Sequence, residues 1–130
     1  RKYQTDLIVL AGFMRVLGEN LISPFKGRIL NIHPSLLPNY PGMNTHKRVL
    51  EDNALEHGVT VHFVTKDLDA GPIIIQKKFM VSDKDNESTL KSKVQKIEHY
   101  LYPKVVKWYA SGRLKMNNGA ALLDNKPINT

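Results

Sequence analysis

An asparagine and a histidine stand two positions apart where an apolar run gives way to prolines, in the stretch LNIHPSLLPNYPG. Side chains two apart on a strand point to the same face, and Asn31 and His33 would lie about 6.6 Å apart along it. Pro34 withdraws a ladder donor and restricts the residue before it, so the strand should end there. The pair would then occupy the carboxyl end of a strand, where ligands bind in open α/β sheets.

The two side chains could share one reaction. An asparagine amide can donate a hydrogen bond to an oxygen that becomes negative in a transition state. A histidine can transfer a proton near neutral pH, and a nearby carboxylate stabilises its protonated form. Asp67 and Asp69, in the later segment TKDLDAGP, are candidates for that carboxylate. The same residue types are also common as structural caps and in turns, so the pattern alone leaves a structural role open.

Other kinds of site find less support in the sequence. The chain has no cysteine, which excludes disulfides, thiolate catalysis and cysteine metal sites. No serine stands in a nucleophile elbow, so covalent acyl transfer has no obvious agent. We expect His62 to be a core residue or a support behind the site. The remaining histidines, His46, His57 and His99, are expected on the surface or packed against helices, and no metal site is expected.

The composition is typical of one globular domain. The 130 residues suffice for a single hydrophobic core, and we treat 1–130 as one domain. No apolar run approaches the ~20 residues of a membrane span, and no signal-peptide cleavage site follows the first residues. We therefore expect a cytoplasmic protein without a membrane partner. The net charge of +7 favours anionic partners, either phosphorylated metabolites or nucleic acid. Nucleic-acid binding is not expected, because the chain has no arginine-rich block or zinc-finger spacing.

Apolar runs alternate with periodic segments along the chain. The expected strands are 6–13, 28–33, 59–65 and 72–81, the expected helices are 19–25, 45–53 and 88–110, and a hairpin is expected around 117–119. This alternation indicates an α/β domain, and the near-continuous apolar run DLIVLAGF suits a parallel strand buried on both faces. We therefore expect a mostly parallel sheet flanked by helices.

The last expected helix is the longest and carries its own boundary signals. Its apolar residues recur every three or four positions, which predicts one buried stripe. Asn86 or Ser88 should cap its start, and Gly112 should follow its end. Pro103 lies inside it and should kink it. The prediction is a long kinked helix near the C-terminus.

Five segments, in this order, resemble the folate-dependent phosphoribosylglycinamide formyltransferases: LAGFMRVL, NIHPSLLPNYPG, HGVTVHFVTKDLDAGPII, QKIEHYLYP and GRLKM. The resemblance covers nearly the whole chain. The Asn-x-His pair and the Asp-x-Gly-Pro element also occur in other formyltetrahydrofolate enzymes, whereas HPSLLPNYPG and GRLKM favour this family. The resemblance implies that the formyl group of 10-formyltetrahydrofolate passes to the amine of glycinamide ribonucleotide in purine synthesis. The amine would attack directly, without a covalent enzyme intermediate or a metal.

The resemblance also implies roles for individual residues. Asn31 would hold the formyl oxygen, His33 would be the general acid and oxyanion partner, and Asp69 would orient His33 and raise its pKa. Glu98 would contact the ribonucleotide, and a cis peptide is expected between Leu37 and Pro38. The folate contacts would come from Asn31 and two segments: Met14, Arg15, Val16, Leu17 and Thr65, Lys66, Asp67, Leu68, Asp69.

One element of the family pattern is not found. The family has an amino-terminal half whose glycine-rich loop cradles the substrate phosphate, and this sequence supplies no such loop. We therefore expect an incomplete formyltransferase-like fold that lacks the mononucleotide-binding half. It would bind glycinamide ribonucleotide poorly by itself and expose a sheet edge. A monomer or weak homodimer is expected.

Two other functions stay open at this point. A formyltetrahydrofolate deformylase would use the same asparagine, histidine and aspartate, with water in place of the amine. A non-enzymatic folate-binding or nucleic-acid-binding module is the second, although the sequence offers no base-reading element. Formate release without the ribonucleotide would favour the hydrolase, and steep salt dependence of DNA binding would favour the binding module.

Overall fold

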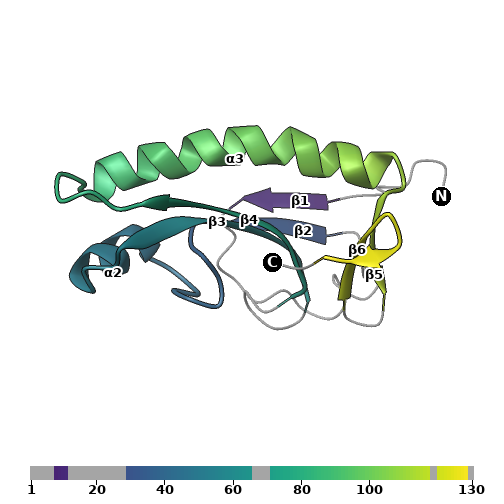
Figure 1. The fold of residues 1–130 in the computed structure, drawn as a ribbon, viewed down its shortest axis with the longest axis horizontal. Helices are drawn as coiled ribbons and strands as arrows, with labels where there is room; N and C mark the ends of the chain where they lie inside the picture. Colours follow the sequence, from purple (N-terminus) through teal and green to yellow (C-terminus); the bar gives the residue numbers. More distant parts are fainter. Residues whose placement is uncertain (1–7, 12–28, 66–70, 118–119, 129–130) are drawn as a thin grey trace.

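The computed structural model describes residues 8–11, 29–65, 71–117 and 120–128, which form two sheets and two helices (Figure 1). In chain order the elements are β1 (Ile8–Ala11), β2 (Ile29–His33), α2 (Thr45–Glu51), β3 (Glu56–Phe63), β4 (Ile73–Met80), α3 (Glu87–Ala110), β5 (Leu114–Asn117), β6 (Ala120–Leu123) and β7 (Lys126–Pro127). Each strand expected from an apolar run and each of the two longer helices has a counterpart here. The short helix expected at 19–25 lies outside the described residues.

The larger sheet has the strand order β1-β2-β3-β4 and is mixed. β1 and β2 are parallel, whereas β2 pairs with β3, and β3 with β4, in antiparallel fashion. The prediction of a mostly parallel sheet is therefore wrong for the described strands. The apolar runs misled because β2 and nearly all of β3 are buried on both faces. That burial, usually a sign of parallel strands, arises here because α3 covers one face and the segment 34–41 covers the other.

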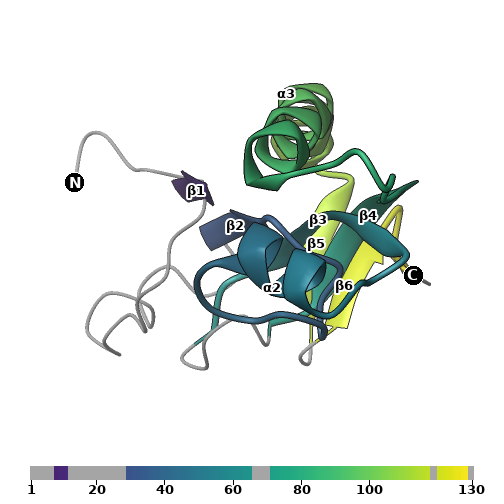
Figure 2. The same cartoon turned by 90° about the vertical axis from the view of Figure 1, so that its left-hand side faces the viewer.

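The hydrophobic core lies between the larger sheet and α3, which runs along one face of it (Figures 1 and 2). Alternate residues of β2 and β3 point into this core, as the period of a strand requires. The buried core side chains are Leu30, Ile32, Val59, Val61, Phe63, Ile74, Val94, Leu101, Val105, Leu114 and Ala121. Burial of each larger aliphatic or aromatic side chain stabilises the fold by roughly 1.5–3 kcal/mol. This face of the sheet thus supplies packing rather than chemistry.

Helix α3 begins and ends as its sequence predicts. The side chain of Asn86 accepts from the Thr89 amide at 2.9 Å, and the Thr89 hydroxyl accepts from the Asn86 amide at 2.8 Å, which completes a capping box. Gly112 follows the helix with φ +76°, the left-handed conformation that glycine adopts without strain. The helix continues through Pro103 to Ala110, and the kink expected there stays a prediction.

The remaining predictions about local structure also hold. The peptide bond between Leu37 and Pro38 is cis. The expected C-terminal hairpin is present as β5 and β6, to which the two-residue strand β7 adds an edge that no sequence signal indicated. In the part of the chain that the structure describes, neither helix has the length and apolar character needed to cross a membrane.

Candidate active site

Four polar side chains form a row on the face of the sheet opposite α3. We call this row, Asn31, His33, Thr60 and His62, the polar face. It follows from the antiparallel register, which pairs Asn31 with His62 and His33 with Thr60. All four side chains are at most 3% exposed. Buried polar groups need hydrogen-bond partners, so the surroundings of this row must supply them.

His33 is held by a backbone carbonyl. Its Nε2 lies 2.8 Å from the carbonyl oxygen of Tyr40. A carbonyl only accepts hydrogen bonds, so Nε2 carries the hydrogen, and the neutral ring is the Nε2–H tautomer. The strand ends at His33, as Pro34 predicts, and the Ser35 amide donates back to the His33 carbonyl at 2.9 Å.

Asn31 is oriented from behind by His62. The Nδ1 of His62 donates to the carbonyl of Phe63 at 2.9 Å, which leaves its Nε2 as an acceptor. The amide nitrogen of Asn31 lies 3.5 Å from that Nε2 and donates to it through a long hydrogen bond. The expectation that His62 lies in the core or behind the site agrees with this arrangement. An amide anchored in this way presents its second N–H in a fixed direction.

The turn after His33 is fastened by two side chains that the sequence analysis missed. The hydroxyl of Thr60 donates to the Ser35 carbonyl at 2.7 Å and accepts from the Leu37 amide at 3.0 Å. The side-chain amide of Gln76 donates to Thr60 Oγ1 at 2.9 Å and to the Leu37 carbonyl at 2.8 Å. Thr60 had a signal, since it alternates with His62 along β3. Gln76, the first polar residue after the apolar start of β4, gave a weaker signal.

The outer side of the same turn is fastened at the surface. The hydroxyl of Tyr40 donates to Asp52 Oδ2 at 2.8 Å, and both terminal nitrogens of Arg48 donate to the Pro41 carbonyl at 2.8 and 2.6 Å. The Arg48 guanidinium also lies 5.4 Å from the centre of the Tyr40 ring. Partial burial, followed by the hydrogen bond to Asp52, raises the pKa of Tyr40. Helix α2 thereby holds the residue whose carbonyl binds His33.

The predicted aspartate loop is not described, but the residues on either side of it are. The segment 66–70, with Lys66, Asp67, Leu68 and Asp69, lies outside the described residues, as do Met14, Arg15, Val16 and Leu17. Thr65 is half-buried directly after β3. Gly71 returns so close to β3 that a Cβ there would overlap the Phe63 carbonyl, and the Phe63 amide donates to the Pro72 carbonyl at 2.9 Å. Gly71 and Pro72 therefore lie beside β3, the strand that carries His62.

Glu98 is not part of the polar face. It lies on α3, the helix on the opposite face of the sheet. Burial raises the pKa of its carboxyl, and the nearby His99 partly offsets this. The structure thus brings Asn31 and His33 together and places Glu98 apart from them.

Two further histidines, the half-buried His46 and the buried His57, are in contact near the end of the sheet. The Nδ1 of His46, on α2, lies 2.9 Å from Nε2 of His57, and the His57 ring stacks edge-on against Phe79. Burial, with smaller contributions from His46 and His33, lowers the pKa of His57 to about 4. Both rings pack where a helix meets the sheet, in line with their expected role. Among the described residues, no group of three potential ligands could hold a metal ion.

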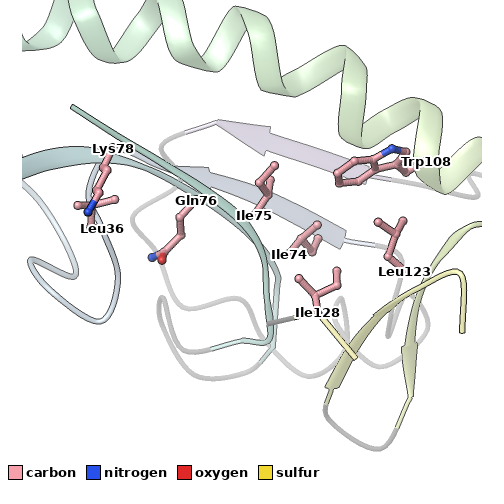
Figure 3. Close-up of a pocket in the computed structure, with 8 residues that line it drawn as sticks. All are labelled: Leu36, Ile74, Ile75, Gln76, Lys78, Trp108, Leu123 and Ile128. Atoms are coloured by element: carbon pink, nitrogen blue, oxygen red, sulfur yellow. The ribbon is translucent and has the colours of Figure 1, made fainter. Parts of the chain in front are cut away.

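An open cleft of about 540 Å³ runs along the edge strand β4 (Figure 3). Its lining residues come from β4, α3, the turn after β2 and the C-terminal strands: Leu36, Ile74, Ile75, Gln76, Lys78, Trp108, Leu123 and Ile128. Neither Asn31 nor His33 lines it. Gln76 is the one residue that belongs both to this cleft and to the fastening of the turn.

Comparison with known proteins shows which family this chain resembles. The model of the Formyl transferase family matches residues 1–106. The phosphoribosylglycinamide formyltransferase of Escherichia coli is 52% identical over 126 residues, which cover 97% of this chain and 59% of the relative. The solved structure of phosphoribosylglycinamide formyltransferase from Coxiella burnetii is 52% identical, covers 95% of this chain and 58% of its own, and superimposes with a TM-score of 0.89.

A formyltetrahydrofolate deformylase is a more distant neighbour. The structure of that protein from Pseudomonas syringae is 27% identical and has a TM-score of 0.83, with 91% of this chain and 40% of its own covered. Proteins named as formyltransferases and as deformylases therefore share this fold, and the sequence identity is higher to the formyltransferases. The chain spans a little under three fifths of the formyltransferases that it matches, 59% in the Escherichia coli case.

Proposed function

Because the chain belongs to the formyl transferase family, we propose that it is the catalytic portion of a phosphoribosylglycinamide formyltransferase. The reaction would move the formyl group of 10-formyltetrahydrofolate to the amine of glycinamide ribonucleotide. The observation that carries the proposal is the buried Asn31–His33 pair, fixed at the end of β2 in a chain 52% identical to an enzyme of that name.

The proposed chemistry is addition followed by elimination. The substrate amine would attack the formyl carbon, so that a new C–N bond forms and the carbonyl oxygen becomes negative. The Asn31 amide would donate a hydrogen bond to that oxygen, and a protonated His33 would lie beside it. The amine then loses one proton, the departing folate nitrogen gains one, and the C–N bond to folate breaks. His33 is suited to move that proton, because an imidazole can transfer protons near neutral pH and its ring is held in place through Nε2 by the Tyr40 carbonyl.

Other parts of the proposal rest on the family resemblance. Asp69 would favour the protonated form of His33 through its charge. Folate would bind between the segment 14–17 and the segment 65–69, and the ribonucleotide would contact Glu98. The cytoplasmic location, the monomer or weak homodimer and the absence of a nucleic-acid partner stay predictions.

A deformylase is the second candidate, supported by the Pseudomonas syringae structure. The two reactions differ only in the nucleophile, so the polar face would serve both. The difference in identity, 52% against 27%, favours the transferase.

The test is product analysis with 10-formyltetrahydrofolate, with and without glycinamide ribonucleotide, using the natural full-length protein. We expect formylated ribonucleotide to appear only when both substrates are present, and His33→Ala to lower kcat far more than it raises the Kd for folate. Formate release at the same rate without the ribonucleotide would replace the transferase by the deformylase. Folate binding without either product would leave only the binding module.

A further inference from the structure

The side chain of Gln76 extends from β4 to the turn that follows β2, the strand that carries Asn31 and His33. One nitrogen, Nε2, donates both to the Leu37 carbonyl at 2.8 Å and to Thr60 Oγ1 at 2.9 Å. The same hydroxyl accepts from the Leu37 amide at 3.0 Å. Both backbone polar groups of Leu37 are thus satisfied by the Thr60–Gln76 pair. Side chains rather than a strand ladder satisfy these groups, because β2 ends at His33, before Pro34.

These hydrogen bonds lie in a buried part of the protein, so their loss would be unfavourable. Leu37 is 5% exposed and Thr60 is fully buried. A buried backbone group without a partner is unfavourable, so the turn would shift to satisfy the Leu37 carbonyl if Gln76 were removed.

A shift of this turn would reach His33 along a short path. Ser35, whose carbonyl is bound by Thr60, donates its hydroxyl to the carbonyls of Asn39 at 2.6 Å and Tyr40 at 3.2 Å. The Tyr40 carbonyl is the acceptor for His33 Nε2. The orientation of the His33 ring therefore depends on an acceptor that the Thr60–Gln76 pair helps to place.

We propose that Gln76 is a positioning residue for His33, acting through the turn 35–40 and not through contact with substrate. The inference deepens the proposed formyl transfer and rests on it for the catalytic readout. Gln76 pairs with Thr60 across β3 and β4, so its side chain lies on the same side of the sheet as the polar face, at the edge strand, where it also lines the cleft (Figure 3).

The cleft supplies a matched control two residues along the same strand. Lys78 lines the same cleft, and its ammonium lies 2.8 Å from Glu56 in an exposed ion pair. Exposed pairs of this kind contribute little to stability. Lys78→Met therefore alters the cleft beside Leu36 but removes none of the hydrogen bonds by which Thr60 and Gln76 hold the turn.

The experiment compares Gln76→Met with Lys78→Met in the natural full-length protein. It measures kcat, the KM for 10-formyltetrahydrofolate and the ¹⁵N shifts of the His33 ring. For Gln76→Met we expect kcat to fall about tenfold with KM within twofold, since small misplacements of catalytic groups have large effects on rate. The His33 Nε2 and Nδ1 shifts should move as well. Lys78→Met should leave all of these quantities unchanged.

A second variant protects the test against misfolding. Thr60→Val keeps the side-chain volume and removes the shared hydroxyl, so it should move the His33 shifts in the same direction as Gln76→Met. A lower melting temperature with an unchanged kcat per folded molecule and unchanged His33 shifts would overturn the inference. If the shifts move but the wild-type protein transfers no formyl group, the positioning holds and the proposed function fails.

Discussion

The two faces of the larger sheet are equally buried and come from the same strands, but they are held in different ways. Toward α3, Val61 and Phe63 pack among aliphatic side chains, and contact area alone stabilises them. Thr60 and His62 alternate with these two residues along β3 and point to the other face, where hydrogen bonds to backbone carbonyls hold them. A truncated apolar side chain loses packing and leaves a cavity, whereas a substituted polar side chain loses the hydrogen bonds that orient its neighbours. Substitutions on the first face should therefore change stability, and substitutions on the second should change chemistry.

The largest effect is expected on the apolar face. Phe63→Ala removes a fully buried aromatic side chain from the core and should lower the free energy of unfolding by roughly 3–5 kcal/mol. Urea denaturation measures this change. Met80→Ala, at a residue 65% exposed at the end of β4, should stay within about 0.5 kcal/mol of wild type. A loss below 1 kcal/mol at Phe63 would mean that α3 does not seal this face.

Substitutions on the polar face should lower the rate of formyl transfer. Asn31→Ala removes the proposed oxyanion donor and should lower kcat about 100-fold, close to 3 kcal/mol of transition-state stabilisation. Steady-state kinetics with 10-formyltetrahydrofolate measures it. Asn39→Ala changes an exposed asparagine in the same segment and should leave kcat unaltered. Equal kcat values for the two variants would remove Asn31 from the proposed mechanism.

The sequence predicted the pair Asn31 and His33 because its signals are local. A period of two, a strand end and a proline suffice to place both side chains on one face, and the structure agrees. Caps are local too, so Asn86 and Gly112 were found at the ends of α3.

What the sequence could not predict depends on pairing at a distance. Whether β3 runs parallel or antiparallel to β2 is decided by the path of the segment between them, which has no periodicity to read. The role of Gln76 needs β4 beside β3 and the turn folded under both, a contact across 39 residues of chain. Burial on both faces looks the same in sequence whether a helix or a proline-rich turn covers the second face.

His57 should make the stability of the fold depend on pH. Its pKa is about 4 in the fold against an ordinary value of 6.5, so between these values the unfolded chain binds more protons than the folded one. Stability should therefore fall as the pH drops from 6.5 toward 4, by on the order of 2 kcal/mol at pH 4.5. Thermal melts across this range measure the slope. His57→Gln should flatten it, and His99→Gln, at an exposed position on α3, should not. A slope that persists in His57→Gln would assign the titration to another group.

The smallest effect is expected where the turn is fastened from outside. Tyr40→Phe removes only the hydroxyl that donates to Asp52, a hydrogen bond at the exposed surface. Water can replace that bond, so unfolding free energy should fall by less than about 1 kcal/mol, and kcat should fall less than in Gln76→Met. Tyr102→Phe, at an exposed tyrosine of α3, is the matched control for loss of a hydroxyl. Because Tyr40 supplies its carbonyl to His33 through the backbone, the variant keeps the acceptor and tests only how firmly it is held. A kcat for Tyr40→Phe as low as that for Gln76→Met would mean that the surface bonds position His33 as strongly as the buried ones.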